Sequence, residues 1–152
     1  MRTTIAIESP RQAETEVLLG LAAEFAAALY PPESNFLLGV DELDLPGVTF
    51  YVARDEAGGA LGVAALAPLA VATAELKSLF VHPDARGRGV AGLLLDRIEK
   101  DAAAHGIREL MLETGPLHAA ALALYRRSGY RPITNFGKYA GEELSVCFAK
   151  PL

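Results

Sequence analysis

The segment Leu79-Phe80-Val81-His82-Pro83-Asp84-Ala85-Arg86-Gly87-Arg88-Gly89-Val90-Ala91-Gly92 decides the expected fold, because it joins a strand to a helix through a glycine-rich loop. Backbone N–H groups at the start of a helix have no partner inside the helix and attract anions. Glycines let the backbone approach a phosphate closely, and Arg86 and Arg88 can add charge-assisted hydrogen bonds to its oxygens. The segment therefore predicts a binding site for a phosphate or pyrophosphate group.

Strand and helix patterns continue on both sides of this loop. Apolar residues at helical spacing predict helices from Pro10 to about Leu29 and from Gly89 to His105. The other expected elements are a strand Thr3–Glu8, a break Tyr30–Asn35, a short helix Phe36–Leu43, a hairpin of Thr49–Arg54 and Ala60–Ala67, strands Glu75–Val81 and Ile107–Glu113, a helix Leu117–Arg127 and a last strand Glu143–Lys150. Antiparallel pairs come first and crossovers later, so we expect a single α/β domain over residues 1–152, with a mixed, mostly antiparallel sheet flanked by helices.

Length and composition limit the class of protein. The chain has 152 residues, of which 51% are hydrophobic and 22% charged, so it can form one core and is too apolar for a disordered protein. Its one cysteine, Cys147, excludes an internal disulfide and a multi-cysteine zinc site, which favours a cytoplasmic location. The histidines lack metal-ligand spacing, and no apolar run has the ~20 residues of a membrane span, so neither a metal nor a membrane is expected.

Charge is unevenly distributed along the chain. Residues 1–60 hold ten acidic and three basic residues, whereas residues 61–152 hold nine acidic and eleven basic ones. This profile lacks the clustered basic face of a nucleic-acid-binding protein, so no nucleic-acid partner is expected. It suits an anionic ligand on the C-terminal part, although scattered solvated charges would give the same totals.

The glycines of the loop admit two other interpretations. Gly87, Gly89 and Gly92 match the G-x-G-x-x-G pattern of dinucleotide-binding proteins, and Glu113 ends the following strand, about where a ribose partner belongs. However, residues 82–86 separate the first glycine from the last apolar residue of the strand, and too little chain follows for a full dinucleotide fold. A glycine-rich turn that merely starts a helix is the other alternative.

The loop matches a third pattern better. Arg86-Gly87-Arg88-Gly89-Val90-Ala91 resembles the R/Q-x-x-G-x-G/A pyrophosphate loop of the GNAT superfamily of acyl-CoA-dependent N-acetyltransferases. A second motif of that family follows in Ala121-x-x-x-Tyr125-x-x-x-Gly129-Tyr130. The resemblance covers residues 60–150 by motif and residues 1–59 only by the order of elements.

Further stretches resemble one bacterial subgroup of small GNAT enzymes whose substrates are unassigned. These are Tyr30–Asn35, Leu112–Gly115, Phe136–Tyr139 and Leu144–Lys150. One position departs from the family pattern. Where the family often has an asparagine that contacts the pantetheine arm, this chain has His118, which is equally interpreted as an ordinary residue of a first helical turn.

The resemblance implies acetyl-CoA as the cofactor. Its pantetheine arm would enter a gap between the strand Glu75–Val81 and the strand Ile107–Glu113, and would pair with free backbone groups of the first strand. The residues implied in cofactor binding are Phe80, Val81, Arg86, Gly87, Arg88, Gly89, Val90, Ala91, His118 and Tyr125.

The resemblance also implies acetyl transfer to a primary amine by direct attack within a ternary complex. Such an amine is mostly protonated at neutral pH, so a base is needed. Glu75 is the candidate general base, with Glu113 next in line. Strand alternation predicts that Glu75, Lys77, Leu79 and Val81 share one face, so a structural ion pair between Glu75 and Lys77 is the alternative.

Tyr125 is the candidate general acid, which returns a proton to the thiolate of CoA; the alternative is a tyrosine whose ring only fills the core. Cys147 is expected to be an inert, buried residue. Because the chain keeps a base and an acid, we expect an enzyme rather than a non-catalytic sensor that binds acyl-CoA.

The expected acceptor is a small, cationic primary amine. Acidic residues concentrate in residues 1–60, which by resemblance form one wall of the acceptor cleft, and a negative potential attracts cations. The expected substrate-binding residues are Tyr30, Ser34, Asn35, Glu113 and Tyr139. The alternative is a surface loop whose tyrosines only pack. The sequence does not fix the oligomeric state, and a homodimer is compatible with it.

Overall fold

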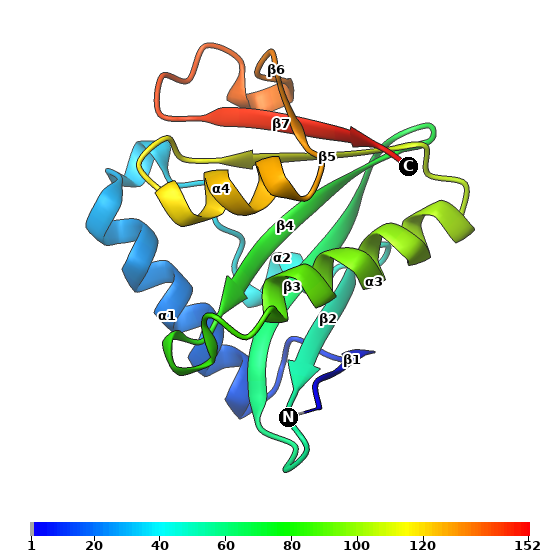
Figure 1. Ribbon diagram of the computed structural model, residues 1–152. Helices are drawn as coiled ribbons and strands as arrows, with labels where there is room; N and C mark the ends of the chain where they lie inside the picture. The colour runs from blue at the N-terminus through cyan, green and yellow to red at the C-terminus, as the bar shows by residue number, and fades with distance from the viewer. Residues whose placement is uncertain (1) are drawn as a thin grey trace.

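Seven strands of the computed structural model form one sheet in the order β1-β2-β3-β4-β5-β7-β6 (Figure 1). The structure describes residues 2–152. The strands are β1 (Thr4–Ile7), β2 (Thr49–Arg54), β3 (Ala60–Ala70), β4 (Thr73–Val81), β5 (Glu109–Thr114), β6 (Arg131–Ile133) and β7 (Val146–Pro151). The helices are α1 (Ala13–Leu29), α2 (Val40–Leu43), α3 (Val90–Ala104) and α4 (Ala119–Arg127), with short 3-10 helices η1 (Pro32–Ser34), η2 (Pro83–Ala85) and η3 (Gly137–Tyr139).

Neighbouring strands of this sheet are antiparallel except for β4 and β5, which are parallel. Strands β4 and β5 are parallel because the crossover through α3 returns the chain to the end of the sheet at which β4 begins. Helices α3 and α4 lie on one face, and α1 and α2 lie on the other (Figure 1). The expected mixed, mostly antiparallel sheet flanked by helices is confirmed. Among residues 2–152, no helix combines the length and the apolar character needed to cross a membrane.

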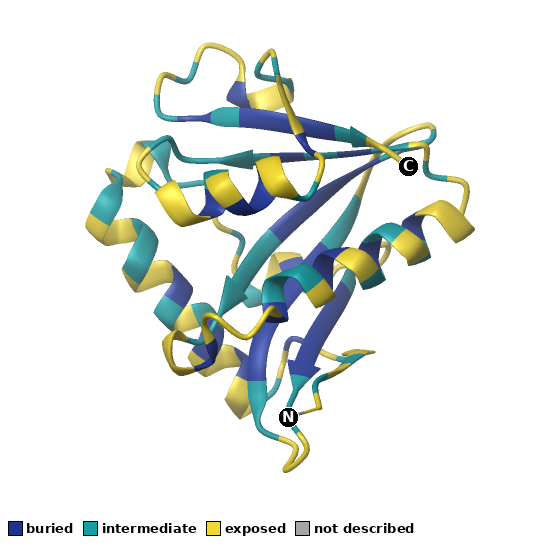
Figure 2. Cartoon of the chain, in the orientation of Figure 1, coloured by how far each residue is buried: buried dark blue, intermediate teal, exposed yellow. Residues whose placement is uncertain are grey.

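Two apolar clusters fill the two faces of the sheet, and Figure 2 shows the buried strands between them. The larger cluster joins the sheet to α3 and α4 and includes Leu94, Ile98 and Leu124. The smaller cluster joins the sheet to α1 and α2 and includes Leu18 and Leu43. Both faces of the central strands are therefore buried, which holds these strands rigidly in place.

Strands β4 and β5 pair only near their N-terminal ends. Thr73–Glu75 pair with Glu109–Met111, and the strands then diverge (Figure 1). Strand β4 continues to Val81 and β5 to Thr114, so their C-terminal parts are not paired with each other. Buried backbone polar groups need partners. This opening is therefore the place in the sheet where an extended ligand could complete the pairing.

A β-bulge interrupts β4 at the point where the two strands part. Ser78 and Leu79 together lie opposite the single residue Ala64 of β3. The φ angle of Ser78 is 56°, a left-handed conformation that is uncommon for a residue with a side chain. A bulge of this kind bends and twists the strand, which contributes to the divergence of β4 from β5.

The bulge overturns one prediction about side-chain direction. Leu76, Leu79 and Val81 all pack against the larger cluster, so the neighbours of Leu76, Glu75 and Lys77, point to the opposite face. The prediction that Glu75 and Lys77 share a face with Leu79 and Val81 is therefore wrong. Strict alternation assumes regular pairing, and one inserted residue reverses every later side chain.

Some element boundaries also differ from the predicted ones. Helix α1 begins at Ala13 rather than Pro10, because the Thr15 hydroxyl donates to the Pro10 carbonyl at 2.8 Å and holds this segment outside the helix. Strand β3 extends to Ala70, because it turns almost directly into β4. Strand β7 begins at Val146, because a hydrogen-bonded turn occupies the preceding residues.

Two adjacent leucines of α3 test the larger cluster. Leu94 is fully buried, whereas Leu93 is 42% exposed. We expect Leu94→Ala to lower the free energy of unfolding by about 2–5 kcal/mol, because it leaves a cavity in a packed core. We expect Leu93→Ala to change it by less than about 0.5 kcal/mol. Urea denaturation of both variants measures the difference, and equal losses would contradict this description of the core.

Candidate functional site

A cavity of about 680 Å³ lies where β4 and β5 diverge. Its walls come from α1, the segment after α1, β4, the loop before α3, the end of β5 and α4. This is the size range of small-molecule and cofactor sites. The cavity therefore brings the glycine-rich loop and the gap between the strands into one space.

The glycine-rich loop forms one end of the cavity. Gly87 and Gly89 have left-handed φ angles of 78° and 76°, and a Cβ at either position would meet no atom within 4 Å. Both glycines line the cavity together with Val90, Ala91 and Gly92, whose N–H groups belong to the first turn of α3. The loop thus presents open backbone and helix-start amides, as an anionic group requires.

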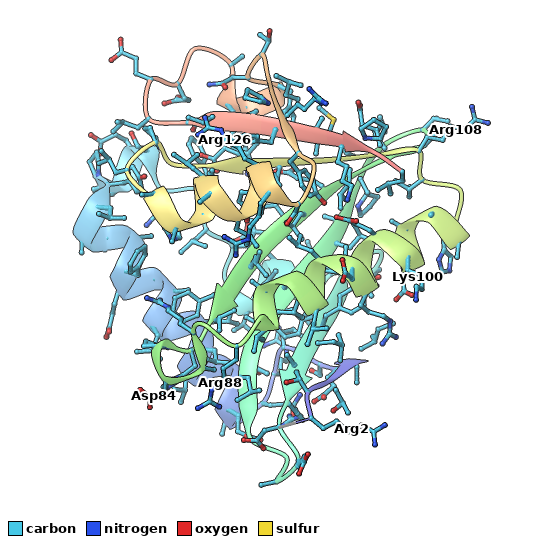
Figure 3. The ribbon with its side chains drawn as sticks, in the orientation of Figure 1. Arg2, Asp84, Arg88, Lys100, Arg108 and Arg126 are labelled. Carbon is cyan, nitrogen blue, oxygen red and sulfur yellow. The ribbon has the colours of Figure 1, made fainter. Side chains whose placement is uncertain are left out.

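The two arginines of this loop lie in different surroundings. The Arg86 guanidinium lines the cavity and lies 5.7 Å from the ring centroids of both Phe25 and Phe80. Arg88 lines a separate cavity of about 240 Å³ with Asp84, and Figure 3 shows both residues on the loop between β4 and α3. Of the two arginines, only Arg86 therefore reaches the larger cavity.

Strand β4 forms the floor of the cavity. Phe80 and Val81 line it, as does Ser78 at the bulge. The Ser78 hydroxyl oxygen is buried and is the one buried side-chain polar atom among residues 2–152 that has no hydrogen-bond partner. Because an unsatisfied buried hydroxyl is unfavourable, it marks a place where a ligand would supply a missing hydrogen bond.

Tyr125 lines the cavity from α4 and is itself buried. Its ring packs against those of Tyr130 and Phe148, with centroid distances of 5.8 and 6.2 Å. Burial, assisted by the negative charge of Glu113, raises the pKa of the Tyr125 hydroxyl. The hydroxyl therefore keeps its proton at neutral pH and can act as a hydrogen-bond donor.

A hydrogen-bonded network joins Glu75, Lys77 and Tyr139 behind the β4 floor. The Tyr139 hydroxyl donates to the Glu75 carboxylate at 2.6 Å, and the Lys77 ammonium donates to Tyr139 at 2.7 Å and to Glu75 at 3.3 Å. All three residues are buried, but only Lys77 lines the cavity. Burial lowers the pKa of Lys77, and the charge of Glu75 opposes this effect.

Glu113 presents its carboxylate to the cavity directly. It lines the cavity from the end of β5 and accepts a hydrogen bond from the Ser145 hydroxyl at 2.7 Å. Burial raises the pKa of Glu113, whereas the Ser145 hydrogen bond and the charge of Lys77 oppose the increase. Among residues 2–152, Glu113 is the one acidic residue that lines this cavity.

The residues predicted to bind the acceptor divide into two groups. Tyr30, Ser34 and Asn35 line the cavity, whereas Tyr139 does not. The Tyr139 ring is buried and meets the ring of Phe36 edge-on at 5.1 Å. Tyr139 therefore lies behind the residues that line the cavity. Its hydroxyl contacts one of those residues, because it accepts a hydrogen bond from Lys77.

Tyr30 joins α1 to the loop between β5 and α4. Its hydroxyl accepts a hydrogen bond from the Leu117 N–H at 2.8 Å. Its ring lies against Gly115 so closely that a Cβ there would collide with the tyrosine hydroxyl and ring. His118, at the start of α4, stacks on Phe25 of α1 at 4.8 Å. The contacts of Tyr30 and the contact between His118 and Phe25 close the cavity along the side of α1.

His118 occupies the position where an asparagine was expected from the resemblance. It lines the cavity, and burial lowers its pKa, with a further contribution from the charge of Arg86. Its imidazole is therefore neutral at physiological pH and can offer one donor and one acceptor. No group of three or more His, Cys, Asp or Glu within residues 2–152 has a geometry suited to a metal ion.

The acidic residues of the N-terminal part lie away from the cavity. Arg11 forms ion pairs with Asp41 and Asp44 at 2.7 Å, and Arg54 pairs with Glu8 and Glu14 at 2.8 and 3.0 Å. The argument that acids of residues 1–60 make the cleft negative is therefore not supported. Overall charge counts could not reveal that none of these acids lines the cavity.

Sequence reasoning missed three residues of the site. The sequence pattern presents Lys77 only as a partner of Glu75, and it marks neither Ser78 nor Phe25 as a site residue. The signal for Lys77 was available, because a lysine in a mostly apolar strand, next to Leu76, must find a buried partner. The Ser78 bulge leaves no such signal.

A model of the family described as "Acetyltransferase (GNAT) family" matches residues 16–130. This span contains the glycine-rich loop, the parted strands and α4, and therefore most of the cavity wall. The match agrees with the resemblance in the glycine-rich loop and around Tyr125.

Similar proteins extend this match to the whole chain. The "IAA acetyltransferase" of Azospirillum brasilense is 41% identical over 150 residues, which is 98% of this chain and 97% of that protein. A Klebsiella pneumoniae structure assigned as an acyl-CoA N-acyltransferase has a TM-score of 0.83 and 29% identity, over 99% of this chain and 97% of that one. A GNAT acetyltransferase structure from Elizabethkingia anophelis, with acetyl-CoA bound, has a TM-score of 0.73 and 21% identity, over 99% and 98% of the two chains. On the family model and the close relative, this chain belongs to the GNAT family of acetyltransferases.

Proposed function

We propose that this protein transfers the acetyl group of acetyl-CoA to the primary amine of a small, cationic substrate, by direct attack within a ternary complex. One observation carries the proposal. A single cavity holds open helix-start amides at one end and, beyond a floor of unpaired strand, Tyr125 and the Glu113 carboxylate. An anionic cofactor and a cationic acceptor would thus meet where a proton donor and a proton acceptor face the same space.

The cofactor would lie along the floor of the cavity. Its pyrophosphate would accept hydrogen bonds from the amides of Gly87–Ala91, supported by Arg86. Its pantetheine arm would pair with the backbone of Phe80 and Val81, which β5 leaves free. Arg88 lies outside this cavity and would act on the pyrophosphate only through its charge, whereas His118 would contact the arm from α4. The neighbour with acetyl-CoA bound supports this choice of cofactor.

The reaction needs one proton acceptor and one proton donor. The acceptor ammonium gives a proton to a base, and the neutral amine attacks the thioester carbonyl. The C–S bond then breaks, and the CoA thiolate takes a proton from Tyr125, while the extra proton on the new amide nitrogen is released and restores the Tyr125 hydroxyl. The raised pKa of Tyr125 opposes full loss of its proton, so the hydroxyl would first stabilise the departing sulfur as a hydrogen-bond donor.

Glu113 is the better-placed base of the two candidates. Its carboxylate faces the cavity, whereas Glu75 lies outside the cavity lining and accepts hydrogen bonds from Tyr139 and Lys77. A base must reach the proton directly or through one water. We therefore assign proton acceptance to Glu113, and we assign to Glu75 the neutralisation of the Lys77 charge.

The decisive experiment measures release of free thiol from acetyl-CoA in the presence of a panel of primary amines. Amine-dependent release supports the transferase. Tight binding of acetyl-CoA without release would instead support the non-catalytic sensor. The relevant partner is a small molecule, and we propose a cytoplasmic location because the buried Cys147 is a free thiol.

Substitution of Gly89 tests the cofactor position. Gly89→Val would place a side chain in the open space over the loop, and we expect it to abolish CoA binding in calorimetry. Gly58→Val is the matched control, because Gly58 also has a left-handed φ, 87°, and open space around its Cβ, but lies in a turn outside the cavity. Both variants should lose similar stability. Equal CoA affinity in the two folded variants would contradict the placement.

Removal of the Tyr125 hydroxyl tests the proposal that this residue is the general acid. Tyr125→Phe keeps the packing of the ring, so we expect CoA affinity to remain while turnover falls by about a hundred- to ten-thousand-fold. Tyr130→Phe is the control, because Tyr130 is a neighbouring buried tyrosine whose hydroxyl donates to Glu99 instead of facing the cavity. Full turnover in Tyr125→Phe would return this residue to a role in packing only.

The pH dependence of the rate tests the base. Burial raises the pKa of Glu113, so wild-type activity should fall as the pH decreases through that raised value and protonates the carboxylate. In Glu113→Gln this acid limb should disappear, and the rate should recover only as the amine deprotonates near its own pKa of about 10. Glu75→Gln should keep the acid limb. The reverse pattern would identify Glu75 as the base.

A further inference from the structure

The amine itself is left open by the proposed function, and the composition of the cavity restricts it. The far end of the cavity from the glycine-rich loop is formed by Tyr30, Phe36, Leu37, Lys77, Glu113 and Leu144, which we call the acceptor end. These residues come from α1, the segment after η1, β4, β5 and the turn before β7. One carboxylate, one lysine and an otherwise apolar wall together restrict the class of amine that can bind at this end.

The charges of the acceptor end suit one ammonium group and no more. Glu113 is its single carboxylate. The other charged groups that line the cavity, Lys77, Arg86 and Arg127, are all positive, and the positive charge of the nearby Lys138 acts on both Lys77 and Glu113. Glu75 cannot serve a second cation, because it lies outside the lining and is already bonded to Lys77 and Tyr139.

Lys77 and Glu113 stand at corresponding positions of the two diverging strands. The pairing of Thr73 with Glu109 and of Glu75 with Met111 would continue to these two residues if the strands stayed together. Instead the strands part, and within residues 2–152 no ion pair joins Lys77 to Glu113 directly. The space between them can therefore admit the ammonium of a ligand beside Glu113.

The remaining walls of the acceptor end are apolar. Phe36 and Leu37 contribute from the segment after η1, and Leu144 contributes from the turn before β7. Leu37 is 39% exposed, so a large apolar side chain is left partly open at this end. Apolar ligand groups gain free energy when they cover such surface, whereas a second ammonium buried there would lack a partner.

We propose that the acceptor is a primary monoamine with an alkyl or aryl body, and that the acceptor end discriminates against diamines and polyamines. The ammonium lies at Glu113, and the apolar body covers Phe36, Leu37 and Leu144. A second ammonium meets apolar carbon and the field of Lys77, so selectivity comes from an attractive and a repulsive element together. This inference rests on the proposed function, because it concerns the acceptor of the same cavity.

The test compares two amines of equal length, pentylamine and cadaverine, which differ by one terminal ammonium group. Thiol release from acetyl-CoA gives kcat/KM for each amine with the wild-type protein. We expect the value for pentylamine to exceed that for cadaverine by roughly tenfold or more, the scale on which one unpaired group in a pocket discriminates. An equal or higher value for cadaverine would overturn the inference.

A charge introduced at Leu37 gives a second, independent readout. In Leu37→Asp a carboxylate becomes available to the distal ammonium, so the ratio of pentylamine to cadaverine should fall by about tenfold. Leu37→Asn is the matched control, because it removes the same apolar surface without adding charge, and its ratio should change much less. An equal ratio in the two variants would show that charge at this wall does not select the amine.

The outcomes separate this inference from the proposed function. Thiol release with cadaverine preferred contradicts the monoamine and leaves the transferase intact. Thiol release with neither amine, while a wider amine panel remains inactive, contradicts the transferase itself. Preference for an amine that also carries a carboxylate would overturn the assignment of Lys77 as a purely repulsive group.

Discussion

The architecture of the site depends on the parting of two parallel strands after three paired residues. A parallel pair inside a sheet normally stays together, because its buried backbone groups need partners. Here β4 keeps its partner β3 on one side and β5 keeps β7 on the other, so the sheet remains held together while the space between β4 and β5 opens. The bulge at Ser78 turns β4 at the same place. The gap is therefore built into the backbone and does not depend on any one side chain.

The two ends of the cavity use different parts of the chain for recognition. At the glycine-rich loop, the proposed anion site consists of backbone amides, and the glycines matter because they carry no side chain to fill that space. At the acceptor end, side chains set the charge, and the backbone only carries them there. Lys77 is desolvated but has Glu75 and Tyr139 as partners, so its position is fixed by buried hydrogen bonds. Rigid charges of this kind discriminate better than solvated ones.

Much of the fold could be predicted from the sequence. Residues 89–105 carry a regular apolar stripe and a glycine stop, and α3 spans Val90–Ala104. The hairpin of β2 and β3 follows from β-branched, aromatic and apolar runs around the turn Asp55–Gly59, although β3 is longer than predicted. Patterns of this kind depend only on residues that are close together in the sequence, so the sequence alone is enough to predict them.

The rest depended on contacts that periodicity does not encode. One residue with a left-handed φ, Ser78, reversed the faces of β4 after the bulge. This is why Leu79 and Val81 turned toward the larger cluster, away from the side of Glu75. Glu75 and Glu113 also differ in their long-range partners, because the Tyr139 hydroxyl of η3 donates to Glu75 whereas the Ser145 hydroxyl donates to Glu113. Charge counts failed for a similar reason, because none of the acidic residues of the N-terminal part lines the cavity.

The contact between Tyr30 and Gly115 explains how an N-terminal helix comes to limit a site made mostly by the C-terminal part. Any side chain at position 115 would collide with the tyrosine ring, so a glycine is needed for this close approach. The Leu117 N–H lies at the beginning of the segment that leads into α4, and without the Tyr30 hydroxyl it would lack that partner. The end of α1 is thus fixed against the loop that follows β5. The segment after α1, which carries Phe36 and Leu37, is held near the parted strands as a consequence. Variation in that segment would change the wall formed by Phe36 and Leu37 without disturbing the helix-start amides of the glycine-rich loop at the other end of the cavity.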